Sequence, residues 1–192
     1  NTNEDYEASF WNIELSYQKR SQYKIFQHNT NTSINLGTGN RKTPSTNNQQ
    51  QRIQLDVEKI FSLNYRNHIY IANHSGFINS NNYIDNELFR TGGIKTLRGF
   101  QENSLVGELF SFFNTEYRYL LDENLYANSI FDFGRIENKN QNLQNTVYSF
   151  GFGIGLETKS GLLKLIFANG KTDNQNFEFR NTKIHLSLAT IF

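Results

Sequence analysis

One arginine and two downstream carboxylates have types and a spacing that indicate a defined interaction. Arg98 lies in the longest stretch without strand patterning, residues 78–106, and Glu116 and Asp132 follow in two alternating segments. A buried guanidinium is costly unless an anion pairs with it, and its planar fork can bind two carboxylates at once. The three residues therefore predict an ion-pair latch between a loop and a wall.

The elements that would position these side chains are antiparallel β-strands. Polar and apolar residues alternate with a period of two through most of the chain, which is typical of strands with one face on lipid or core. By this parity Glu116 and Asp132 project from the same face of two neighbouring strands, opposite to Tyr117 and Phe131. The nine predicted strands cover about 6–18, 22–36, 51–64, 67–77, 107–120, 124–134, 146–157, 161–169 and 181–192.

The composition favours a membrane barrel over a soluble domain. Aromatic residues make up 15% of the 192 residues, with 17 Phe and 10 Tyr, yet no apolar run reaches the length of a membrane helix. In a transmembrane β-barrel only every second residue meets lipid, so the average composition stays polar. We therefore predict an all-β fold, an antiparallel up-and-down transmembrane β-barrel with about nine strands in this chain. A soluble β-sandwich is the alternative.

The connections between the predicted strands alternate between short and long. The long ones are 37–50, 78–106, 135–145 and 170–180, and the Asn-rich stretches 28–50 and 138–145 read as low-complexity loops. Outer-membrane barrels have short periplasmic turns and long extracellular loops, so we expect Phe192 at the periplasmic side. Complete bacterial barrels have an even strand number that starts from the periplasm. Nine strands therefore indicate further strands before residue 1, with residues 1–192 as the C-terminal part of one barrel domain.

The stretch 78–106 is too apolar for a solvated loop and far longer than a usual connection. Folding back into the barrel lumen would bury its apolar side chains. Gly92 and Gly93 would serve as a hinge, and Gly99 would let the backbone approach the wall.

Three motifs in this order resemble the C-terminal half of outer membrane protein 85 superfamily barrels, most closely those of the BamA/TamA-like type. The resemblance covers about residues 50–192 and rests on Leu97-Arg98-Gly99-Phe100, Asn114-Thr115-Glu116-Tyr117-Arg118 and Phe131-Asp132-Phe133-Gly134. It implies a sixteen-stranded barrel, a latch that includes Arg98, Gly99, Phe100, Glu116 and Asp132, and a last strand that forms one side of a seam. That strand would carry the C-terminal assembly signal, with Ile184, Leu186, Leu188 and Phe192. No segment of this chain resembles the periplasmic POTRA domains of the superfamily.

The resemblance implies a non-enzymatic function in the bacterial outer membrane. The first expectation is assembly and insertion of outer-membrane proteins, as in BamA-like insertases. Its partners would be unfolded outer-membrane protein clients, outer-membrane lipids including lipopolysaccharide, and accessory lipoproteins or upstream periplasmic domains. The alternatives are a polypeptide secretion pore of the two-partner type and a structural outer-membrane anchor barrel.

Other chemistries have little support in the sequence. A net charge of +1 argues against nucleic acid as a partner, and the absence of Cys excludes thiolate metal sites and disulfides. The four His residues are dispersed, and no Ser, His and Asp stand in a triad or nucleophile-elbow context. We therefore predict no catalytic residue, no metal site and no cofactor.

Overall fold

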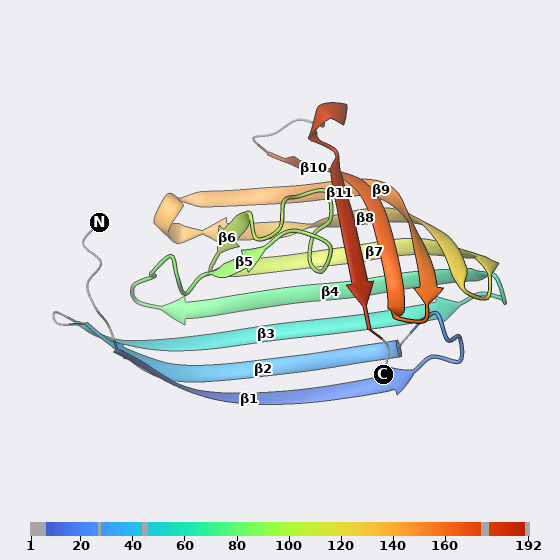
Figure 1. Cartoon of the computed structure of the whole chain (residues 1–192). Coiled ribbons are helices and arrows are strands. Elements are labelled where there is room, and N and C mark those ends of the chain that lie inside the picture. The colour runs from blue at the N-terminus through green and yellow to red at the C-terminus, as the bar shows by residue number, and fades with distance from the viewer. Residues whose placement is uncertain (1–6, 27, 44–45, 174–176, 191–192) are drawn as a thin grey trace.

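One antiparallel sheet dominates the computed structural model, which describes residues 7–26, 28–43, 46–173 and 177–190. Within these residues the sheet has nine strands in the order β1-β2-β3-β4-β7-β8-β9-β10-β11, and every pair is antiparallel. The all-β, up-and-down prediction is confirmed (Figure 1). The strands are β1 (Glu7–Arg20), β2 (His28–Lys42), β3 (Asn47–Ser62), β4 (Asn67–Ser80), β7 (Leu109–Asp122), β8 (Leu125–Asn138), β9 (Leu143–Thr158), β10 (Gly161–Thr172) and β11 (Lys183–Ala189). No helix in the described part of the chain is long and apolar enough to cross a membrane.

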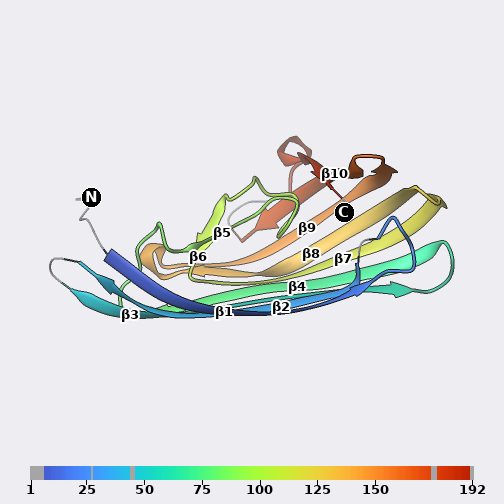
Figure 2. The same ribbon diagram turned by 60° about the horizontal axis from the view of Figure 1, so that its bottom comes forward.

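The sheet is bent into a trough (Figure 2). Its two faces differ chemically. Along β7, Phe113 and Tyr117 are exposed on one face, and Asn114, Glu116 and Arg118 are buried on the other. The same alternation of exposed aromatic or aliphatic residues with buried ones runs through β8 and β9. A wall with an apolar outer face and a polar, filled inner face is the arrangement of a membrane β-barrel.

The connection from β4 to β7 covers residues 81–108 and lies over the concave face of the trough (Figure 2). It forms a small antiparallel sheet of its own from β5 (Phe89–Thr91) and β6 (Leu105–Gly107). Its apolar residues join a buried cluster with the wall, which contains Leu97, Phe100, Phe110, Phe112, Ile136 and Val147. This packing explains why the loop can be rich in apolar residues.

Two predicted long loops are wrong, because the strands extend through them. Within the stretch 37–50, residues 37–42 belong to β2 and residues 47–50 to β3, and these strands pair continuously from Thr30↔Lys59 to Lys42↔Asn47. The stretch 135–145 likewise belongs mostly to β8 and β9, joined through the short 3₁₀ helix η1 (Lys139–Gln141). Alternation is imposed where one face of a strand meets lipid. Beyond that zone both faces can be polar, so Asn- and Gln-rich strand ends carry no period-two signal.

The predicted strand 22–36 begins too early. Residues 21–26 form a turn in which Ile25 and Phe26 are buried, and β2 begins at His28. The predicted last strand 181–192 also differs, because η2 (Phe179–Asn181) occupies its start and the described strand is Lys183–Ala189. Phe192 lies outside the described residues.

A charged side chain on the convex face should destabilise the protein in a bilayer. Phe152 lies near the middle of β9 with 65% of its surface exposed. We expect Phe152→Arg to lower the free energy of unfolding by about 2–4 kcal/mol, the cost of a cation near the bilayer midplane. Urea unfolding in lipid vesicles measures this change. Gln54→Arg, on the concave face of β3, is the control and should cost far less; equal costs would contradict the assignment of faces.

Candidate functional site

Arg98 lies at the tip of the inserted loop, between carboxylates of two adjacent strands. Its Nε donates to Asp132 Oδ2 at 2.8 Å, and its backbone N–H donates to the same oxygen at 3.1 Å. Its two terminal nitrogens form ion pairs with Asp132 Oδ1 on β8 and Glu116 Oε1 on β7. All three side chains are buried, with Arg98 4% exposed and Asp132 fully enclosed. The structure thus brings together the three residues that the spacing singles out.

A second arginine completes the charge balance around Glu116. Arg118 Nε donates to Glu116 Oε2 at 2.7 Å, and Asn128 Nδ2 donates to the same oxygen at 3.1 Å. Two buried arginines therefore face two buried carboxylates, and each carboxylate accepts several hydrogen bonds. Such a saturated cluster avoids the large penalty of an unpaired buried charge.

The loop arginine is held in its charged form. Burial alone would lower the pKa of Arg98, but attraction to Asp132 and Glu116 outweighs it and raises the pKa above the ordinary value. Arg98 therefore remains a cation at every physiological pH. The cluster can hold a loop in place electrostatically.

Gly99 allows the tip to sit directly on the wall. It has φ +82°, and a Cβ there would lie 2.7 Å from the backbone of Asn169 and Gly170 on β10. Phe100 packs over Gly170, since its ring would be the nearest neighbour of a Cβ at that position. Only a residue without a side chain satisfies both the positive φ and this close approach.

The tip also contacts the last described strand. The Gly99 N–H donates to His185 Nε2 on β11 at 3.1 Å, and Asn114 Nδ2 on β7 donates to the Thr96 carbonyl at 2.9 Å. In the sequence, His185 is one of four dispersed histidines. Its inward parity on β11 is visible in the sequence, but nothing there indicates that the loop tip reaches it.

The base of the loop has an anchor that the sequence did not reveal. Here the loop supplies the carboxylate and the wall supplies the arginine, the reverse of the arrangement at Arg98. Glu87 of the loop pairs with Arg41 on β2, and Gln50 Nε2 on β3 donates to Glu87 Oε2 at 3.0 Å. Arg41 also donates to the Asn82 carbonyl at 2.8 Å, and Arg52 on β3 donates to the Glu87 carbonyl. Arg41 is almost completely buried. This base anchor fixes the loop to the β2–β3 wall, and Arg98 fixes it to the β7–β8 wall.

The remaining predicted residues lie apart from the ion-pair cluster. Gly92 and Gly93 have φ of +102° and +94° and lie between β5 and the tip. Ile184, Leu186 and Leu188 are exposed on the outer face of β11, where an apolar strand would meet lipid. Among the described residues no three His, Asp or Glu side chains are grouped so as to hold a metal ion.

A curved antiparallel sheet with an apolar outer face and an arginine-bearing loop on its inner face has the architecture of a transmembrane β-barrel wall. A family model described as haemolysin secretion/activation protein ShlB/FhaC/HecB matches residues 2–158. The chain belongs to this family of outer-membrane transporter barrels. The match lies on the secretion side of the superfamily, whereas the motifs alone suggested the BamA/TamA-like side. No curated protein matches the chain.

Substituting Gly99 should displace the loop tip. In Gly99→Ala the positive φ alone costs about 1–2 kcal/mol, and the new methyl group collides with the β10 backbone. We expect faster protease cleavage within residues 81–108 and a lower free energy of unfolding. Gly37→Ala is the control, because the only close approach of its Cβ would be to the end of the flexible Asn12 side chain, with Arg52 Cβ at an ordinary 3.6 Å. Equal cleavage rates in the two variants would contradict the close seating of the tip.

Breaking the base anchor should lower the free energy of unfolding as much as breaking a buried ion pair in another protein. Glu87→Gln leaves Arg41 buried without an anion, so we expect a loss of about 3–5 kcal/mol in urea unfolding. The matched control is Arg135→Gln, which breaks the solvent-exposed Arg135–Glu137 pair and should cost less than about 1 kcal/mol. A loss for Glu87→Gln no larger than the control would show that the base anchor contributes little.

Proposed function

We propose that residues 1–192 form the C-terminal part of one barrel domain of a polypeptide secretion pore, with loop 81–108 as its internal plug. The observation that carries this proposal is the match of residues 2–158 to a secretion/activation family. The burial of the loop on the concave face, held by Arg98, supports it. The cargo would be a partner polypeptide, as the haemolysin is for the relatives that give the family its name.

A plug in a secretion pore has to be stable at rest and movable during transport. The ion pairs of Arg98 and Glu87 supply stability at the tip and the base of the loop. Between these two anchors, Gly92 and Gly93 supply backbone positions that tolerate rearrangement. Cargo that binds the open pore better than the closed one would shift the population by its differential affinity. Arg98, Glu116 and Asp132 act in this proposal as a latch and perform no chemistry.

The connections support one orientation of the barrel. The loop leaves the sheet at the end formed by Ser80 and Leu109, and the chain reaches Ala189 at the opposite end. Long loops of outer-membrane barrels face the cell exterior. The loop would therefore enter the lumen from outside, and the C-terminus would lie at the periplasmic side.

The order of the three sequence motifs favours a second candidate function, insertion of outer-membrane proteins. There the exposed backbone of an edge strand such as β11 would pair with a client strand, because unpaired backbone in lipid is costly. Its partners would be unfolded barrel clients and accessory lipoproteins. Planar-bilayer conductance of the full-length protein separates the two: a sizeable pore supports secretion, and a barrel that stays closed supports insertion. A barrel that neither conducts nor affects the outer-membrane proteome when depleted would be a structural anchor.

Removing the arginine should release the plug. Arg98→Ala leaves Asp132 and Glu116 without their shared cation, so we expect more frequent and larger openings in planar bilayers and protease cleavage within 81–108. Secretion of the partner polypeptide in cells expressing this variant is the functional readout. Arg135→Ala, on the outer face of β8, is the control. Wild-type conductance and cleavage in Arg98→Ala would refute the plug.

A further inference from the structure

The connection between β1 and β2 is a second segment that folds into the trough. Residues 21–26 form a tight turn in which the Phe26 N–H donates to the Tyr23 carbonyl at 3.0 Å. Ile25 and Phe26 are 1% and 3% exposed. Turns at this end of an outer-membrane barrel are expected to be short and solvated. A turn that buries two large apolar side chains in the lumen therefore needs an explanation.

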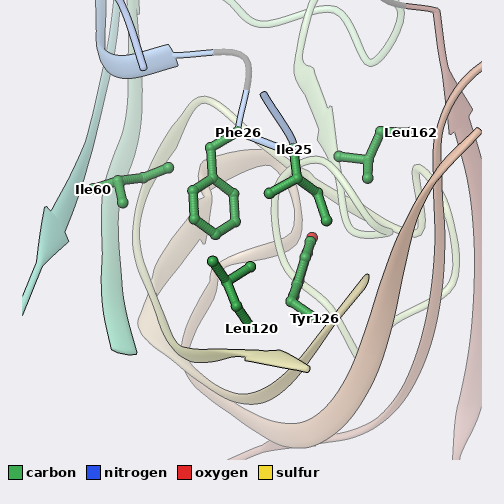
Figure 3. Close-up of a cluster of buried hydrophobic side chains, with 6 residues drawn as sticks. All are labelled: Ile25, Phe26, Ile60, Leu120, Tyr126 and Leu162. Atoms are coloured by element: carbon green, nitrogen blue, oxygen red, sulfur yellow. The ribbon is translucent and has the colours of Figure 1, made fainter. Parts of the chain in front are cut away.

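The turn reaches from one wall of the trough to the opposite wall. Ile25 and Phe26 belong to one buried cluster with residues of four different strands, and they point into the space between them (Figure 3). Those residues are Ile60 of β3, Leu120 of β7, Tyr126 of β8 and Leu162 of β10. Strand β10 lies six positions from β2 in the sheet order. The turn thus forms an apolar bridge across the lumen.

This bridge and the inserted loop enter from opposite ends of the sheet. The turn joins Arg20 to His28, at the end where β10 and β9 meet through Thr158 and Gly161. The loop enters at the end formed by Ser80 and Leu109. An apolar constriction blocks ions and water by dewetting, so the turn has the chemistry of a closure.

Arg118 links the two segments, because it contacts the turn directly and the loop through Glu116. On one side its guanidinium carbon lies 5.2 Å from the centre of the Phe26 ring, 4.3 Å from that of Tyr70 and 5.5 Å from that of Tyr126. On the other side its Nε donates to Glu116, and Glu116 binds Arg98 of the loop. Cation–π contacts are strongest where water is excluded. Phe26, Arg118, Glu116 and Arg98 therefore form one continuous chain of contacts from the turn to the loop tip.

We propose that the turn 21–26 is a second closure of the pore and that Arg118 couples it to the Arg98 loop. The proposal rests on the proposed function as a pore. A cavity of about 80 Å³ lies beside the turn, lined in part by Glu58, Tyr70 and Lys164. Phe26 and Arg118 both line this cavity, so displacing Phe26 enlarges it beside the guanidinium and admits more water there. Hydration weakens the attraction between Arg118 and Glu116, which loosens the carboxylate that holds Arg98. Movement of either closure then favours movement of the other.

The coupling is measured on the loop itself, in full-length protein reconstituted in vesicles. The chain has no Cys, so Ile94→Cys supplies a single thiol near the loop tip, whose maleimide labelling rate reports loop opening. Phe26→Leu keeps the turn apolar but removes the ring from Arg118. We expect it to raise the labelling rate about fivefold or more, the lower range for a coupled pair of sites. Phe131→Ala, which removes an aromatic ring from the outer face of β8, is the control. An unchanged rate in Phe26→Leu overturns the coupling.

The closure is measured by conductance, with a reversible cross-link in place of a deletion that could prevent folding. In the Ile25→Cys/Leu162→Cys protein, oxidation forms a disulfide bond that holds the turn against β10. We expect channel openings to be rare under oxidising conditions and to recover after addition of reductant. Full conductance with the cross-link formed overturns the second closure. A protein that never conducts, yet labels faster in Phe26→Leu, shows that the coupling holds and that the pore function fails.

A double-mutant cycle joins the two measurements. Arg98→Ala and Phe26→Leu are each combined with the reporter thiol, and then both together. Coupled closures give a combined rate well below the product of the separate increases, because the first change already releases the second contact. If the labelling rate of the combined variant equals the product of the two separate increases, the closures act separately and the role of Arg118 is overturned.

Discussion

The structure depends on one constraint, that a guanidinium excluded from water has to meet anions. Arg98 meets this constraint only if Glu116 and Asp132 project to the same side of neighbouring strands, which fixes the register of β7 against β8. It also requires a loop long enough to reach the middle of the trough and a glycine at the next position. Burial of this one charge therefore requires the register, the length of the loop and the glycine at position 99 together.

The loop acts as a brace across the trough because its two anchors lie on different walls. Glu87 binds β2 and β3, whereas Arg98 binds β7 and β8, and the tip also rests on β10 and donates to His185 of β11. Opposite charge signs in the two anchors mean that neither can pair with the partner of the other. This arrangement specifies one seating of the loop, and a shift along the wall would leave buried charges unpaired.

The sequence predicts the strand pattern that contact with lipid imposes. It does not predict the contacts that distant segments make inside the trough. The nine long strands and the inward parity of Glu116 and Asp132 follow from alternation, which a lipid-facing wall enforces; that Arg98 serves as a latch stays a prediction. Alternation fades in the Asn-rich ends of β2 and β3, where both faces can be polar, so those strand ends read as loops. The Arg41–Glu87 pair and the buried turn depend on how distant segments meet inside the trough. Arg41 and Glu87 are 46 residues apart, and no local pattern encodes their contact.

The latch motifs resemble insertases while the chain belongs to a secretion family, and the physics of the latch accounts for both. A saturated cluster of two arginines and two carboxylates stiffens one wall and seats a loop, whichever polypeptide the barrel handles. An insertase works at its edge strands and can keep its lumen filled. A secretion pore has to empty its lumen, so every buried segment there opposes transport. Arg118 bears on this difference, because it touches Phe26 of the turn and is linked through Glu116 to Arg98 of the loop. In a pore its contacts would decide whether the two segments leave together or in turn.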